Sequence, residues 1–195
     1  MKNTLTVFAP IAALLLVAGA ACAHGVGTQI PAPRHIAVFG PLPALPSGVA
    51  DLRFSEMFKM PIGPMGLEPS PTLAALNGHQ VRLVGYMANN ALPVPGRLIL
   101  APLPVSLGGE DEALADDLPA SAVFVHLSGS DADVLLPNFQ GLIQLQGRLE
   151  IGAADEPSGH VSSVRLILDN SGTTRLAEAA RVAQMRLNMA RALSR

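Results

Sequence analysis

Five apolar segments of strand length, spread between residues 80 and 168, limit what this chain can fold into. Each is rich in aliphatic residues and is bounded by turn or loop sequences, which is typical of β-strands. Asn77-Gly78 gives a strong turn signal before the first segment, and Gly85 inside it indicates a bend or bulge. The 17 prolines and 18 glycines of the chain argue against an all-helical bundle. The segments cover residues 80–87, 97–101, 121–127, 141–150 and 160–168.

Five strands of this length can close into a small barrel, which leaves no strand edge exposed. Gly85 permits the sharp coiling that such a closure needs. We therefore predict a mainly β fold whose domain, residues 76–170, is a five-stranded OB-like (oligonucleotide/oligosaccharide-binding) small barrel. A sandwich of two sheets is the alternative. A proline-rich N-terminal arm precedes this domain, and a C-terminal α-helix follows it.

Residues 24–75 are predicted to form the proline-rich arm and an irregular connection. Proline fixes one backbone angle and lacks an amide hydrogen, so closely spaced prolines favour an extended chain. Residues 35–39 are predicted to form a short strand within the arm, and residues 52–58 a short helix or strand. Frequent prolines and glycines then interrupt any regular pattern from residue 60 to residue 71.

Residues 1–23 have the pattern of a secretory signal peptide. Lys2 gives a positive start, a short apolar run follows, and Ala21-Cys22-Ala23 fits a cleavage site. We therefore expect a periplasmic or secreted protein that begins at His24 and has no transmembrane span after signal removal. Cys22 is the single cysteine, and an alternative is that it becomes the lipidated first residue of a lipoprotein.

Residues 173–195 are predicted to form an amphipathic helix, with Thr173 or Thr174 as its cap. One apolar row, mostly alanine, starts at Leu176, and a second row follows on another side, so two surfaces are needed to cover the helix. The helix is rich in arginine, whereas the rest of the mature chain is acidic. We predict that it binds a protein partner or a second copy of the chain. The second row is Val182, Met185, Met189 and Leu193, and the predicted partner-binding residues are Arg181, Arg186, Arg191 and Leu187.

Charge and motifs exclude several functions. With 13 Lys and Arg against 15 Asp and Glu, the chain lacks the basic excess that nucleic-acid binding requires. It also lacks the common motifs of serine hydrolases, zinc proteases and nucleotide-binding enzymes. Ser162 and Ser163 adjoin His160, but a solvent-facing row of a strand accounts for them. We therefore predict a protein that is not an enzyme.

Copper binding is the alternative function. A free amine and an imidazole on one residue, His24, can chelate Cu(II), and methionine thioethers suit Cu(I). The predicted ligands are His24, Met57, Met60 and Met65. An acidic loop could instead hold a hard cation such as Ca²⁺, although a solvated loop or a docking patch for the basic helix explains it as well. The loop holds Glu110, Asp111, Glu112, Asp116 and Asp117.

Short motifs within residues 76–170 resemble those of a family of secreted bacterial proteins with a domain of unknown function. The resemblance implies the fold and the compartment and no activity, because the Cys-x-His motif of that family is absent here. We therefore expect a non-catalytic periplasmic accessory or binding protein. The matching positions are Leu76-Asn77-Gly78, Val81, Gly85-Tyr86, Leu100-Ala101-Pro102 and Gly147-Arg148-Leu149.

Overall fold

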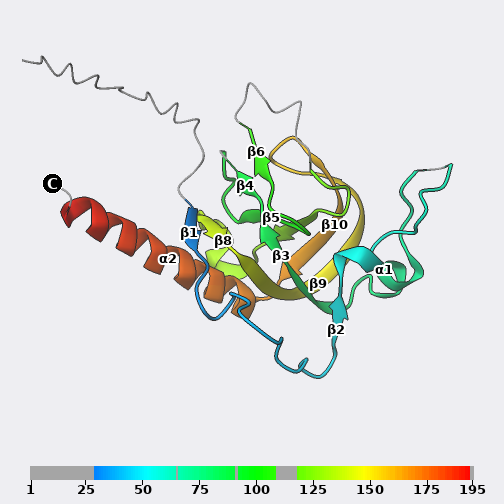
Figure 1. The fold of residues 1–195 in the computed structure, drawn as a ribbon, viewed down its shortest axis with the longest axis horizontal. Coiled ribbons are helices and arrows are strands. Elements are labelled where there is room, and N and C mark those ends of the chain that lie inside the picture. Colours follow the sequence, from blue (N-terminus) through cyan, green and yellow to red (C-terminus); the bar gives the residue numbers. More distant parts are fainter. Residues whose placement is uncertain (1–28, 65, 91, 109–117, 194–195) are drawn as a thin grey trace, which may run out of the picture.

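The computed structural model describes residues 29–64, 66–90, 92–108 and 118–193. The fold is mainly β with a C-terminal helix, as predicted (Figure 1). All five predicted strands are present, although three of them differ in length from the prediction. They are β3 (Gln80–Met87), β5 (Arg97–Ala101), β7 (Val123–His126), β9 (Leu142–Asp155) and β10 (Val161–Leu168).

These five strands pair in a closed ring. The order is β3-β5-β7-β10-β9, and β9 pairs again with β3. The β7–β10 pair is parallel and the other four are antiparallel. A sixth strand, β2 (Val49–Leu52), runs parallel to the first half of β3. Because each of the five strands has two neighbours in the ring, their backbone groups are largely satisfied within it.

Gly85 lies where β3 changes its neighbour. The strand pairs with β2 up to Leu83 and with β5 from Tyr86 onward. A Cβ at Gly85 would come within 2.7 Å of both the Ala101 carbonyl oxygen and a ring carbon of Phe54. The absence of a side chain therefore lets β5 and the segment after β2 approach β3 closely, which the predicted bend requires.

Nine apolar residues of the five ring strands are buried in the structure. Eight of them belong to the main core, in which alternate residues of the ring strands pack together. Phe124 belongs instead to a second cluster with Ile99, because its neighbours Val123 and Val125 point into the main core. The nine are Val81, Leu83, Leu98, Leu100, Phe124, Leu145, Leu149, Val164 and Leu166.

Two short strand pairs and several short turns complete the β region. β1 (Gln29–Pro31) pairs with β8 (Asn138–Gln140), and β4 (Asn89–Asn90) pairs with β6 (Ser106–Leu107). The segment 52–58 is divided between the end of β2 and a 3-10 turn, η1 (Phe54–Glu56). A second 3-10 turn, η3 (Gly129–Asp131), precedes β8, and a short helix, α1 (Pro71–Ala75), precedes β3.

The predicted strand at residues 35–39 is wrong. This part of the arm is a turn, and only Ala37 makes a bridge, with Ile143 of β9. The Ile36 side chain is buried, and its carbonyl accepts a hydrogen bond from the Gln144 amide. Residues 35–39 are therefore held by single bonds to β9 and not by a continuous ladder.

Helix α2 (Asn170–Leu193) begins three residues before the predicted start. Thr173 and Thr174 lie inside it, so their predicted role as caps is wrong. The Asp169 carboxylate accepts the Gly172 amide at 2.7 Å, which is the hydrogen bond of an N-cap. This bond and a second one from the Ser171 hydroxyl hold the pKa of Asp169 below its usual value, and the Gly172 amide is the main cause.

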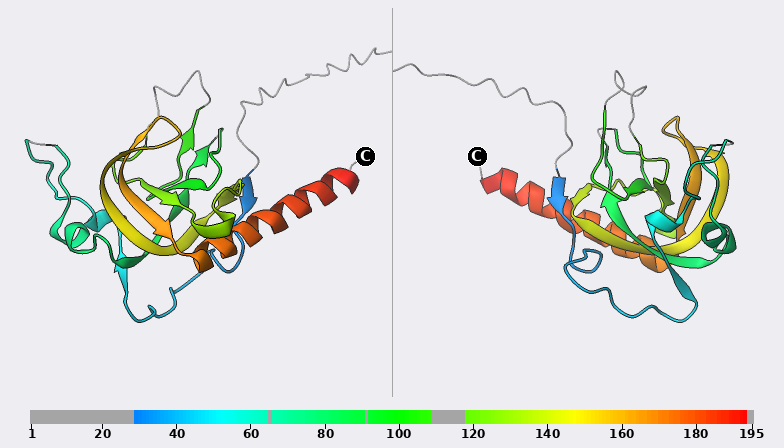
Figure 2. Two further views of the ribbon diagram at one scale, coloured as in Figure 1. Left: turned by 180° about the vertical axis from the view of Figure 1, so that it is seen from behind. Right: turned by 45° about the vertical axis from the view of Figure 1, so that its right-hand side comes forward.

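The two halves of α2 have different surroundings. Buried residues of the first half pack on the ring, and Leu176 and Ala177 are fully covered. The second half extends beyond the strands (Figure 2). No helix in the described part of the chain is both long and apolar enough to cross a membrane.

Candidate functional site

A groove of about 680 Å³ runs between the N-terminal arm and α2. We call it the arm–helix groove. One wall is the chain from Ile30 to Arg34 together with Phe39, and the other is the side of α2 from Ala179 to Leu187. Its surface is mostly apolar, and it is open to solvent. Its volume lies within the range of about 300–1,000 Å³ that is usual for ligand sites.

Pairing with β8 positions the first part of the arm. β1 pairs with β8, and the Ala32 amide continues that pairing with a hydrogen bond to the Gln140 carbonyl. Farther along, the His35 ring is hydrogen-bonded to the Arg175 carbonyl in the first half of α2 at 3.2 Å. The wall formed by the arm is therefore attached both to β8 and to α2, which fixes its position.

An exposed apolar row lies on α2 next to this groove. We call it the outer row. With 3.6 residues per turn, these residues lie on roughly the opposite side from Leu176 and Ala180, which face the core. The ring therefore cannot cover the outer row. It consists of Val182, Met185, Met189 and Leu193, whose exposed fractions are 48%, 63%, 61% and 87%.

The arm–helix groove also carries two arginines, Arg34 and Arg186. Both are exposed, and neither forms an ion pair or a side-chain hydrogen bond within the described residues. Other cations do have carboxylate partners: Arg82 pairs with Asp51 at 2.8 Å, and Lys59 pairs with Glu68 at 2.7 Å. The groove is therefore apolar and carries positive charge that no described carboxylate pairs with.

The structure separates the four predicted partner-binding residues. Arg186 and Leu187 line the arm–helix groove, and Leu187 is half-buried. Arg181 is hydrogen-bonded to Asp131 of η3 and so attaches α2 to the rest of the chain. Arg191 lies in the last turns of α2. Sequence reasoning missed Arg34 because nothing local to the arm indicates that it faces the helix.

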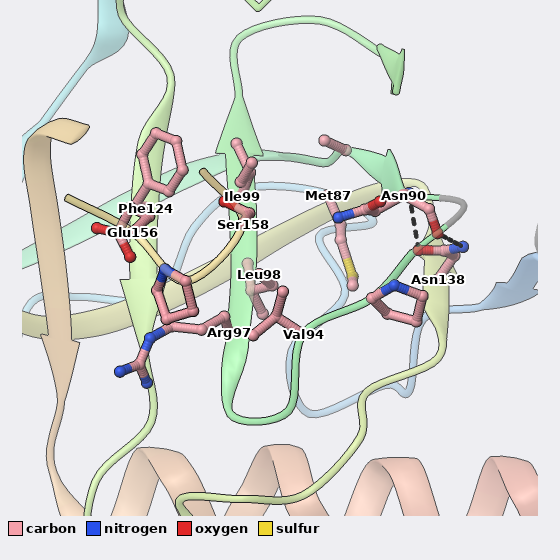
Figure 3. A pocket seen from close by; sticks show the side chains of 13 residues that line it. Met87, Asn90, Val94, Arg97, Leu98, Ile99, Phe124, Asn138, Glu156 and Ser158 are labelled. Carbon is pink, nitrogen blue, oxygen red and sulfur yellow. Dashed lines mark hydrogen bonds between the residues drawn. The ribbon is translucent and has the colours of Figure 1, made fainter. Parts of the chain in front are cut away.

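A second and much narrower pocket lies beside β5 and β7 (Figure 3). Its walls include Leu98, Ile99 and Phe124, and hydrogen bonds between Asn90 and Asn138 close one side. Its volume of about 30 Å³ has room for about one water molecule. A ligand of ordinary size therefore does not fit this pocket without movement of the surrounding loops.

Beside this pocket, His126 of β7 pairs with Glu156 in the turn between β9 and β10. The His126 Nε2 lies 2.9 Å from a carboxylate oxygen of Glu156, whose side chain is only 3% exposed. Burial lowers the pKa of His126, and this outweighs the opposing attraction of Glu156. The neutral ring then donates a hydrogen bond to the carboxylate. The pair ties the turn to β7, and sequence reasoning missed it because Glu156 lies in a sequence typical of exposed turns.

The predicted solvent-facing row at residues 160–162 is wrong for Ser162. That side chain is fully buried and donates a hydrogen bond to the Ala154 carbonyl. Burial alternates regularly along β10, and Ser162 lies on the same face as the core residues Val164 and Leu166, which explains why it is buried. The His160 ring is hydrogen-bonded to the Ser158 hydroxyl at 3.0 Å.

The predicted copper ligands have different environments. Met57 is fully buried in the main core, whereas Met60 is 74% exposed. His24 and Met65 lie outside the described residues, as does the whole acidic loop from Glu110 to Asp117. Within the described residues, no three His, Cys, Asp or Glu side chains gather as metal ligands would. Copper binding remains a prediction.

This chain is similar to a DUF3299 family protein from Pseudomonas aeruginosa PAO1, known from a crystal structure. The two chains are 14% identical with a TM-score of 0.39, and the match covers 62% of this chain and 93% of the other. No protein-family profile matches the sequence, and no curated protein does. The neighbour's family is named for a domain of unknown function.

Proposed function

We propose that this chain is a non-catalytic accessory protein of the periplasm, which binds a partner protein through helix α2. The outer row carries this proposal. Isolated exposed apolar residues are ordinary, but a continuous apolar row on a helix that extends beyond its domain marks an interaction site. Export through residues 1–23 would bring the protein to that compartment.

We further propose that the ring is an OB-like barrel. Numbered along the chain, its strands follow the order first, second, third, fifth, fourth and back to the first, with a parallel third–fifth pair, which is the order of OB folds. Those folds bind ligands on the face of their second and third strands, here β5 and β7. In this chain Ala88 and Leu107 cover part of that face.

Size favours α2 over the ring as the binding element. The arm–helix groove has a volume of about 680 Å³, against about 440 Å³ for a pocket beside β9 and β10 and about 30 Å³ for the pocket on β5 and β7. The ring then acts as a scaffold, and the helix and arm present the binding surface. This is consistent with the position of most functional sites on segments that a rigid framework holds in place.

Affinity purification from a periplasmic extract with the mature chain tests this function. The variant Met185→Glu/Met189→Glu puts charge on the outer row, so we expect a partner captured by the wild type to be reduced by about tenfold or more. The matched control is Met60→Glu, because Met60 is a methionine outside α2 that is at least as exposed. If all three proteins capture the same set in equal amounts, α2 is not the binding element.

A further inference from the structure

We infer that the arm–helix groove binds an acidic protein segment, whose carboxylates pair with Arg34 and Arg186 while its apolar side chains fill the groove. This inference rests on the proposed function and names the chemistry of the partner. Two arginines without carboxylate partners among the described residues line an otherwise apolar groove.

The charge of the groove argues for an acidic occupant. Arg34 comes from the arm and Arg186 from α2, so two segments far apart in sequence bring positive charge to one groove. The nearby Arg181 is already paired with Asp131, and α2 has no acidic residue after Glu178. Positive charge beside apolar surface favours a partner with negative charge at the matching positions, and it repels a basic one.

The same charges argue against a second copy of α2 as the occupant. Helices that pack side by side bring residues that flank their apolar rows close together. Arg186 lies next to the outer row, so two copies of α2 would bring arginines near one another without intervening carboxylates. Like charges in such positions are destabilising. A different chain with acidic flanks avoids this repulsion.

The extent of the apolar surface favours a polypeptide over a single lipid. Val182 belongs both to the arm–helix groove and to the outer row, so the two surfaces are continuous. From Val182 the row continues to Leu193, which is three turns of helix, or about 16 Å. A helix with apolar residues at intervals of three and four would cover both surfaces at once.

A random twelve-residue peptide library displayed on phage provides a defined probe. We expect the mature wild-type protein to select peptides that combine leucine-like and acidic residues. The selected peptide should bind the Arg34→Glu/Arg186→Glu variant about tenfold or more weakly. The same peptide with lysine in place of its acidic residues should bind that variant better than the wild type. Arg53→Glu is the matched control, because Arg53 is exposed and does not line the groove, and it should bind like the wild type.

Several results would overturn the inference. Selected peptides without acidic residues, or unchanged affinity in the Arg34→Glu/Arg186→Glu variant, would remove the arginines from the binding site. If Met185→Glu/Met189→Glu nevertheless abolished peptide binding, the proposed function of α2 would stand without this inference. Displacement of the peptide by laurate would assign the groove to a lipid carboxylate. A dimer by light scattering that Arg34→Glu/Arg186→Glu dissociates would assign it to a second copy.

Discussion

Asp169 fixes the start of α2 through a single side chain. Its carboxylate accepts the Gly172 amide at 2.7 Å and also a hydrogen bond from the Ser171 hydroxyl at 2.9 Å. Serine and glycine are poor helix formers, so the helix would otherwise start later in the chain. The Ser128 amide donates to the Thr173 hydroxyl and anchors the same turn to the end of β7. The cap therefore orients the helix on the ring.

We expect Asp169→Ala to lower the free energy of unfolding by about 1 kcal/mol, the usual cost of losing an N-cap. Because the folded pKa of Asp169 is depressed, its contribution is present above the ordinary value of 3.8 and is lost as the pH falls through the folded pKa. Urea unfolding of the two proteins at pH 7 and at acid pH measures this. A difference that persists in full after the carboxyl is protonated would contradict the capping role.

His126 gives a second prediction, with its own pH range. Its folded pKa is lowered, mainly by burial, so the unfolded chain binds the proton more readily. The free energy of unfolding should therefore fall as the pH drops below about 6.5, and level off once the folded protein also binds the proton. Urea titrations of the wild type and of His126→Gln between pH 5 and pH 8 give the comparison. Stability that rises toward acid pH only in the wild type would mean that the folded state favours the charged ring.

Local sequence is a poor guide to the role of an individual residue when that role depends on contacts with distant parts of the chain. Glu156 follows a strand and precedes Pro157, which reads as an exposed turn, yet β7 brings His126 against it. Arg34 likewise reads as one residue of a loose arm. It faces the arm–helix groove only because β1 pairs with β8, more than 100 positions away in sequence. The sequence pattern around Glu156 or Arg34 does not indicate which distant strand or helix the residue meets.

Among the elements, the ring strands could be predicted and the arm could not. β3 and β5 have the predicted bounds because dense apolar residues and flanking turns define them locally. β9 continues five residues beyond the predicted end at Glu150, through a Gly-Ala-Ala stretch of low strand propensity. Pairing with β10 holds that extension in place. In the arm, the Ile36 and Ala37 amides donate to the Pro33 carbonyl and form a turn where a strand was predicted.

Helix α2 combines a structural half and an exposed half. Leu176, Ala179 and Ala180 are part of the main core, so removal of the whole helix would also open the ring. From Gln184 onward every side chain that the structure describes is exposed except that of Leu187. A truncation that tests binding without disturbing the core should therefore begin after Ala183.

For the whole molecule, closure of the ring depends on one continuous core. Leu145 of β9 lies opposite Leu83 of β3, at the pair that closes the ring, and it is 5% exposed. Leu145→Ala should lower the free energy of unfolding by about 2–5 kcal/mol, the usual range for a buried leucine. Leu103→Ala is the matched control, because Leu103 is 52% exposed, and it should cost much less. Equal losses from the two variants would mean that Leu145 is not a core residue.

We propose that α2 contacts a partner protein while the ring serves as its scaffold. A photo-crosslinking amino acid at Met185, in the full-length chain expressed in its native host, tests this contact. We predict a crosslink to one discrete protein, and none when the same amino acid replaces His79, which is also exposed but lies beside β3. Crosslinks of the same kind from both positions, or from neither, would contradict it.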